Sequence, residues 1–160
     1  LYNETPNDIY SLFGEGLDRQ KVKIAVISSL YGSTPTRVRK MTGLPKEEIK
    51  KIVDHFQIKK IEKSIVTQFN ERGFFYNLYG RPIHDISSPV NYWLQSSAAD
   101  YSCLAFLNLV ERMNLKVRAV IHDAIIVEVE DSELDLLSKI KKINDPITNI
   151  KLRIEQTCLS

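Results

Sequence analysis

Lys116-Val-Arg-Ala-Val-Ile-His-Asp-Ala-Ile-Ile-Val-Glu-Val-Glu130 is the stretch on which the interpretation of the whole chain depends. Two runs rich in β-branched residues flank the polar pair His122-Asp123, a pattern that predicts two strands, 115–121 and 124–130, joined by a tight turn. A carboxylate held between strands suits a hard cation such as Mg²⁺. Asp123 can equally supply ordinary turn chemistry, and these residues alone favour that simpler interpretation.

The composition is that of a soluble globular protein with a core, because the chain has 160 residues, of which 43% are hydrophobic. The net charge of +2 is too small to indicate nucleic acid, so any basic surface must be local. Cys103 and Cys158 lack metal-ligand spacing, and Cys103 is expected to be a small core residue. With no apolar run of membrane-spanning length, we expect no membrane contact. Because the two cysteines form no disulfide framework, we expect an intracellular location, in the cytoplasm or nucleoid, or in the host cytoplasm if viral.

The first part of the chain is predicted to be helical, with helices near residues 8–13, 18–31, 35–42, 46–54 and 57–72. In the second of these, Arg19, Lys23, Ile27 and Tyr31 recur every four residues and form a stripe that drifts slowly around the helix. Arg19 and Lys23 near the positive end of the helix dipole predict an anion site that fits a triphosphate, with Tyr31 further along to meet a base or sugar. The simpler alternative is a solvated basic face.

An aromatic-rich hairpin is predicted next, because residues 74–79 and 82–86 flank Gly80-Arg81. His84 has no evident partner there, and His55, in the preceding helical region, is interpreted as structural. A long helix over 89–113 carries Asn91 and Gln95 one turn apart, and such amides can contact base edges, although simple polarity at a helix start explains them as well.

The end of the chain is predicted to hold a helix of about 132–143 and a strand at 150–154 that joins the central hairpin. Helices come first in the sequence, and hairpins alternate with helices afterwards. This order predicts an α+β fold, with an antiparallel sheet and packed helices, that carries a helical subdomain.

These motifs, in this order, resemble family A DNA polymerases of the bacterial polymerase I type. Arg19-x3-Lys23-x7-Tyr31-Gly32 resembles the fingers-helix motif, and Asn91-x3-Gln95-x2-Ala98-Ala99-Asp100 is similar to the long palm helix. Val120-Ile-His-Asp123 resembles the palm carboxylate motif, and the hairpin at Gly80-Arg81 resembles the one in the family. The resemblance extends from about residue 8 to the C-terminus, and it implies a fingers-like helical subdomain over 1–72 and a palm-like α+β subdomain with the antiparallel palm sheet over 73–160.

The resemblance implies template-directed DNA synthesis, in which a dNTP is joined to a primer 3′ end by a two-metal mechanism. Asp123 would be the catalytic residue and would bind Mg²⁺. Arg19 and Lys23 would hold the triphosphate, and Tyr31 would stack near the templating position. Tyr10 and Ile27 stand where the family contacts a phosphate and the sugar.

The remaining roles implied by the resemblance concern primer–template DNA. Asn91 and Gln95 would contact the minor groove, where the acceptors report pairing geometry more than sequence. His122 would contact the primer end, and Gly32 would allow close packing.

Departures from the family pattern bear on the chemistry. Ile27 replaces an aromatic ring, Ala124 replaces a glutamate, Tyr10 replaces a histidine, and Ser87 stands where some members have arginine. The family's other metal-binding aspartate precedes the region that this chain covers, and one carboxylate cannot hold two metals. We therefore expect the C-terminal part of a polymerase domain, which acts with a second polypeptide or a missing segment that carries the thumb and the first palm carboxylate.

Two alternatives stay open. A single-subunit, phage-type RNA polymerase would suit the small residue Ala124 after His122-Asp123 and the aliphatic Ile27, whereas the helix from Gln95 to Asp100 argues for a DNA polymerase. A non-catalytic DNA-binding or assembly subunit would explain both Ala124 and the missing carboxylate.

Overall fold

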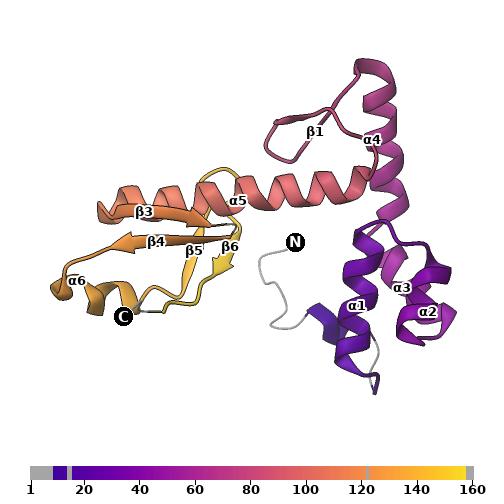
Figure 1. The fold of residues 1–160 in the computed structure, drawn as a ribbon, viewed down its shortest axis with the longest axis horizontal. Coiled ribbons are helices and arrows are strands. Elements are labelled where there is room, and N and C mark those ends of the chain that lie inside the picture. The colour runs from indigo at the N-terminus through magenta and orange to yellow at the C-terminus, as the bar shows by residue number, and fades with distance from the viewer. Residues whose placement is uncertain (1–8, 14–15, 122, 158–160) are drawn as a thin grey trace. The chain divides into compact units, whose positions relative to one another are not determined.

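The computed structural model describes residues 9–13, 16–121 and 123–157, and the chain divides into two compact units, residues 1–95 and 96–160 (Figure 1). The long helix α5 (Pro89–Met113) runs through the division. The expected boundary between a fingers-like part, 1–72, and a palm-like part, 73–160, is a functional division and stays a prediction. Within the described ranges, no helix is both long and apolar enough to cross a lipid bilayer.

The first unit is mainly helical, as the sequence predicts. Its helices are η1 (Ile9–Leu12), α1 (Arg19–Leu30), α2 (Pro35–Thr42), α3 (Lys46–His55) and α4 (Ile58–Arg72). Capping explains where α1 and α2 begin, because the Asp18 carboxylate accepts a hydrogen bond from the Gln20 amide at 2.8 Å, and the Thr34 hydroxyl accepts one from the Arg37 amide at 3.3 Å.

The core of this unit joins η1, α1, α2 and α3. The buried apolar side chains are Phe13, Val22, Ala25, Val26, Val38, Leu44, Ile49 and Ile52. The ring of Phe13 packs edge-on against His55, with centroids 5.0 Å apart, and His55 also lies edge-on to Phe56 at 5.1 Å. His55 is exposed and contacts both rings, and its structural interpretation stays a prediction.

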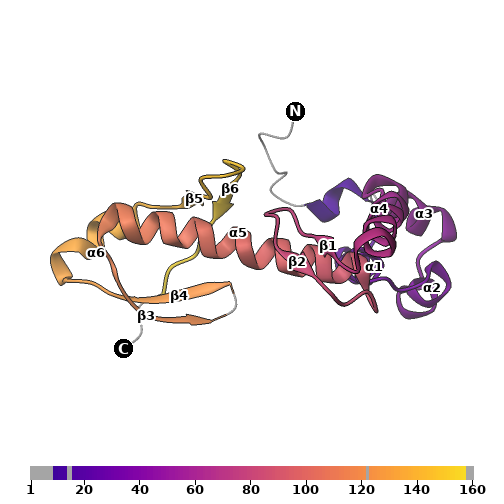
Figure 2. The same cartoon turned by 90° about the horizontal axis from the view of Figure 1, so that it is seen from above.

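A small hairpin follows α4 (Figure 2). Strands β1 (Phe75–Tyr76) and β2 (Pro82–Ile83) pair antiparallel, with Phe75 opposite Ile83 and Tyr76 opposite Pro82. Phe75 is fully buried, and the hairpin contacts α4. The aromatic-rich hairpin predicted from the sequence is confirmed.

The second unit packs its strands against the C-terminal half of α5. Its further elements are β3 (Lys116–Ile121), β4 (Ala124–Glu128), α6 (Asp131–Ser138), β5 (Lys142–Asn144) and β6 (Lys151–Arg153). The core holds Ala105, Leu109, Leu115 and Ile143. The fold class is α+β, and the strands form two-stranded antiparallel sheets.

Two predictions for the end of the chain were wrong. Strand β6 pairs with β5 and not with the central hairpin, and residues 142 and 143 are strand where the helix of about 132–143 was expected to continue. The fully buried Asp145 accounts for both, because its carboxylate accepts hydrogen bonds at 2.9 Å from the amides of Ile147 and Thr148. This turn folds the chain back on itself, so that residues 142–144 meet residues 151–153.

Candidate nucleotide-binding and catalytic sites

Helix α1 presents the basic stripe predicted from the sequence. Arg19 and Lys23 are exposed, Ile27 is half-buried, and Tyr31 at the helix end is 49% exposed. The opposite face of α1 is in the core through Val22, Ala25, Val26 and Ser29. The burial pattern therefore places the side chains of Arg19, Lys23 and Tyr31 at the surface.

The surroundings of this stripe strengthen its attraction for anions. From residue 19 to residue 46 the chain has seven basic residues and no acidic one: Arg19, Lys21, Lys23, Arg37, Arg39, Lys40 and Lys46. Helices α1 and α2 also contact each other. Within residues 19–46 these cations are not interspersed with carboxylates, so they raise the local potential and attract phosphates.

Tyr10 and Arg19, both predicted as nucleotide contacts, lie together. The guanidinium carbon of Arg19 is 5.3 Å from the centre of the Tyr10 ring, within cation–π distance. Tyr10 also packs against the core of the first unit. The ring therefore orients the arginine at the first turn of α1.

The end of α1 lies close to the residue that precedes α5. A Cβ added to Gly32 would lie 3.9 Å from the hydroxyl oxygen of Ser88, which is an ordinary contact. Gly32 has φ +80°, a conformation that other residues adopt only with strain. Conformation, more than the close packing expected from the sequence, therefore requires glycine at this position.

The predicted DNA-contacting amides lie in the first two turns of α5. Gln95 is exposed, and Asn91 is half-buried. The Asn91 Oδ1 atom is buried and has no hydrogen-bond partner in the described part of the chain. A buried acceptor without a partner costs free energy, which a donor from a ligand would recover.

Asp123 lies in the turn between β3 and β4 and is exposed. Ile121 pairs with Ala124, so the turn is tight and the carboxylate is held at the tip of the hairpin. At the open end, Glu128 forms ion pairs with Arg118 and Lys116, and the hydrogen bond from Arg118 lowers the pKa of Glu128. His122 lies outside the described residues.

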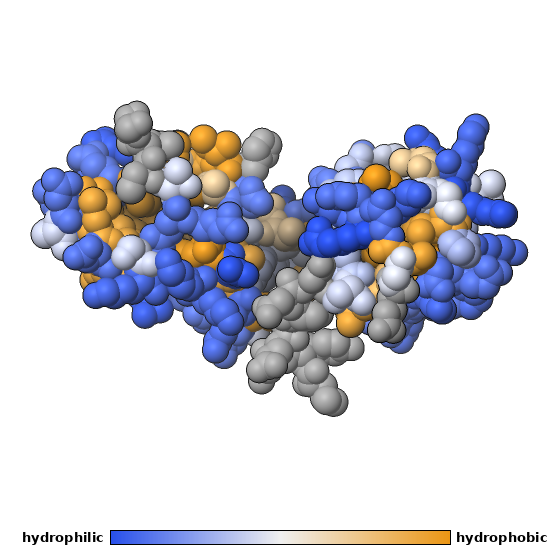
Figure 3. Space-filling model, turned by 90° about the horizontal axis from the view of Figure 1, so that it is seen from below, coloured by the Kyte–Doolittle hydropathy of each residue, from blue (hydrophilic) through white to orange (hydrophobic). Residues whose placement is uncertain are grey.

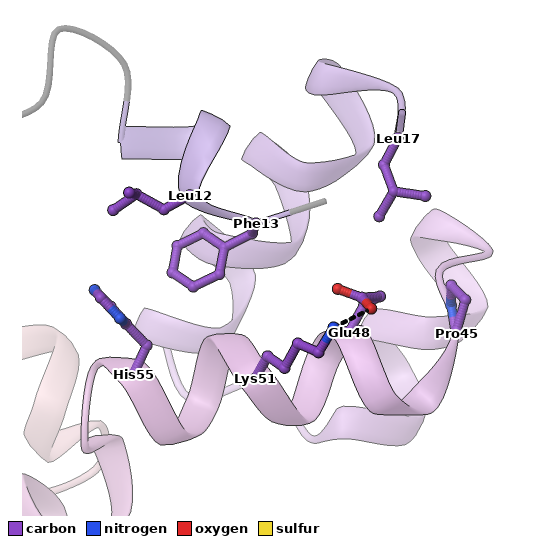
Figure 4. Close-up of a pocket in the computed structure, with 7 residues that line it drawn as sticks. All are labelled: Leu12, Phe13, Leu17, Pro45, Glu48, Lys51 and His55. Atoms are coloured by element: carbon purple, nitrogen blue, oxygen red, sulfur yellow. Dashed lines mark hydrogen bonds and ion pairs between the residues drawn. The ribbon is translucent and has the colours of Figure 1, made fainter. Parts of the chain in front are cut away.

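Sequence reasoning missed a cavity in the first unit. It has a volume of about 510 Å³ and is lined by Leu12, Phe13, Leu17, Pro45, Glu48, Lys51 and His55 (Figure 4). Lys51 donates a hydrogen bond to Glu48 at 2.6 Å across its floor. The lining residues come from η1, the start of α1 and α3, and such non-local assemblies leave no local sequence pattern.

The second unit has an apolar recess of about 270 Å³, lined by Cys103, Phe106, Leu107, Val110, Val117, Val120 and Ile125. Cys103 is exposed at this recess, so its predicted place in the core was wrong. Hydrophobic side chains also gather in patches on the face drawn in Figure 3. The helix around Cys103 is apolar on its exposed side as well as on its buried side. The sequence pattern therefore did not show which of the two sides faces the core.

Comparison with known proteins gives two informative similarities. Over 122 residues the chain is 27% identical to a DNA polymerase of Mycobacterium phage D29, and the match covers 70% of this chain and 20% of the phage protein. Its fold is similar to the POL domain of Pol1 from M. smegmatis, solved in complex with DNA primer-template and dNTP. That similarity has a TM-score of 0.56 and 18% sequence identity, and it covers 83% of this chain and 31% of the other. No protein-family model matches the chain.

The resemblance to family A-like DNA polymerases is confirmed. The chain spans 20% of the length of the curated polymerase and 31% of the solved polymerase chain. The α+β fold class expected from the sequence is the one observed.

Proposed function

We propose that this chain is part of a DNA-directed DNA polymerase, in which α1 holds the incoming dNTP and the start of α5 contacts primer–template DNA. The observation that carries the proposal is the set of basic side chains on α1 and α2, where residues 19–46 include no acidic residue and α1 ends beside the residue that precedes α5. The similar M. smegmatis domain was solved with both of these ligands, which supports the same pair here.

The nucleotide contacts proposed for α1 follow the order of its side chains. Arg19, oriented by Tyr10, and Lys23 would bind the triphosphate oxygens through charge-assisted hydrogen bonds. Ile27 would face the sugar and Tyr31 the base. An aliphatic side chain at position 27 offers no ring to the sugar, so sugar selectivity must be measured directly.

The DNA contacts proposed for α5 begin with its two amides. The unpaired Oδ1 of Asn91 would accept a hydrogen bond in the minor groove, for example from a guanine amino group. Gln95, one turn further and exposed, would contact the neighbouring base pair. Gly32 would leave the path to the template open, and His122 would contact the primer end.

The metal chemistry requires residues beyond those described. Asp123 can supply one carboxylate ligand, but the described ranges contain no group of three or more His, Cys, Asp or Glu side chains that could hold a metal ion. The described residues therefore do not fit a complete two-metal Mg²⁺ site. We propose Asp123 as one ligand and catalytic residue, with other carboxylates supplied from outside the described residues.

A second polypeptide or a further segment that carries the remaining carboxylate and the thumb stays a prediction, as does the intracellular location. Mass analysis of the native complex tests the first of these. A partner that co-purifies, and without which primer extension stops, would support a split polymerase.

The experiment that tests the proposed function is primer extension by the complete protein with Mg²⁺, in parallel reactions with dNTPs and with ribonucleotides. We expect template-directed addition of dNTPs. Preference for ribonucleotides would favour the RNA polymerase alternative, and DNA binding without any synthesis would favour a non-catalytic subunit.

A further inference from the structure

The hairpin of β1 and β2 has one buried face and one aromatic face. Phe75 and Ile83 pair with each other, and Phe75 is fully buried against the first unit. Because side chains alternate across a strand, the flanking residues share the opposite face. That face carries the rings of Phe74, Tyr76, Pro82 and His84.

The three aromatic rings of this face, Phe74, Tyr76 and His84, form one cluster. The Phe74 and Tyr76 centroids are 5.2 Å apart with the rings nearly perpendicular, and Phe74 and His84 are 5.7 Å apart. Tyr76 is 39% exposed, and His84 is exposed. An edge-to-face pair leaves a ring face free for a further aromatic group.

The hairpin turn is fixed by hydrogen bonds, so the aromatic face is preorganised. The Oδ1 atom of the buried Asn77 accepts hydrogen bonds from the amides of Tyr79 at 3.0 Å and Arg81 at 2.9 Å. The Asn77 amide donates to the Arg81 carbonyl at 3.0 Å, and Gly80 has φ +79°. A rigid platform loses little entropy when a ligand binds.

Charge around the hairpin is balanced, which distinguishes it from the basic surface of α1 and α2. Arg72 and Arg81 are matched by Glu71 and Asp85, and the hydrogen bond from the Ser87 amide to Asp85 lowers the pKa of that carboxyl, so that it is charged at neutral pH. The hairpin therefore has no excess charge with which to bind phosphates. Its attraction for a ligand must come from the rings.

We propose that this aromatic face stacks the unpaired bases of single-stranded DNA. The inference rests on the proposed function, since it is DNA that would bring flat aromatic groups to this surface. Every base offers a π-face, so such stacking tolerates any sequence. Residues 84–88 connect the hairpin directly to α5, whose first turns carry Asn91 and Gln95, so a short segment joins the aromatic face to the helix proposed to contact DNA.

The test is fluorescence anisotropy with the complete protein and two labelled probes: a single-stranded oligonucleotide and an abasic oligonucleotide of equal length. Stacking predicts tighter binding of the probe with bases. Tyr76→Thr keeps strand propensity but removes the ring, and it should weaken binding of that probe about tenfold, within a range of roughly 5- to 150-fold, while leaving the abasic probe unchanged.

Controls separate stacking from folding and from charge. Leu78→Thr removes a non-aromatic side chain that is 54% exposed at the same hairpin and should change neither affinity, and Tyr76→Phe should retain binding. If circular dichroism shows that the Tyr76→Thr variant is unfolded, the His84→Thr variant is tested in its place. It should bind the probe with bases no more tightly than the abasic probe. The salt dependence of binding should be the same in Tyr76→Thr and the wild type, because no phosphate contact is removed.

Equal affinity of the wild type for the abasic and normal probes would overturn the stacking proposal. So would an unchanged affinity in a folded Tyr76→Thr variant. In either case, binding to duplex primer–template would leave the proposed function standing, whereas a protein that binds no DNA in any form would refute both.

Discussion

Replacing Lys23 by alanine is the substitution whose effect on nucleotide binding can be reasoned most fully. Lys23 lies on the exposed face of α1, and no carboxylate in the described ranges forms an ion pair with it. Its ammonium group is therefore available to a phosphate. We expect Lys23→Ala to raise the KM for dNTPs strongly.

The size of the expected loss in nucleotide affinity follows from the exposure of the Lys23 side chain. Two unit charges about 4 Å apart interact by about 1 kcal/mol in bulk water and by about 4 kcal/mol at the effective dielectric constant near a protein surface. A hydrogen bond to a charged group contributes about 1.5–3 kcal/mol, which lies between these limits. This corresponds to a loss of roughly 10- to 150-fold in nucleotide affinity.

Steady-state primer extension at varied dNTP concentration measures this effect, and Lys21→Ala is the matched control. Lys21 is also exposed on α1, two residues away and on a different side, so its loss changes the net charge equally. We expect Lys21→Ala to change the KM by less than threefold, as an order-of-magnitude estimate for a distant, screened charge. Equal effects of the two substitutions would refute the specific contact of Lys23.

Two further predictions concern α5 and the core. Gln95→Ala should weaken binding to primer–template DNA, measured by gel shift, more than it raises the KM for dNTPs. A larger effect on the KM than on DNA binding would contradict the DNA-contacting role proposed for this helix. Ile52→Ala removes a fully buried side chain and should lower the free energy of unfolding by about 2–5 kcal/mol in urea titration. Ile24→Ala, at a side chain that is 42% exposed, should cost less than about 1 kcal/mol, and a similar loss in both variants would contradict the assigned core.

Most helices could be predicted because their ends are fixed by local chemistry. Thr34, Pro35 and Gly43 delimit α2, and Asp18 caps α1, so the residues that delimit α2 and begin α1 are visible in the sequence. The stripe from Arg19 to Tyr31 was likewise visible, because its spacing alone places these side chains on adjoining parts of one helix.

The remainder depends on contacts between distant residues. Strands β5 and β6 are three residues each, and the buried turn at Asp145 brings them together. The cavity around Glu48 joins residues of η1 and α3, and the aromatic face joins Phe74 to His84 across a hairpin. Cys103 is exposed, and this could not be predicted because the residues around it are apolar on both sides of the helix.

Comparing Asp123→Asn with Asp135→Asn in Mg²⁺-dependent primer extension tests the central claim most directly. Both are exposed aspartates of the second unit, at the hairpin turn and on α6 respectively, so each substitution removes one exposed negative charge. The account predicts that Asp123→Asn abolishes extension while DNA binding persists, and that Asp135→Asn extends primers like the wild type. Full extension by the Asp123→Asn protein would contradict the account.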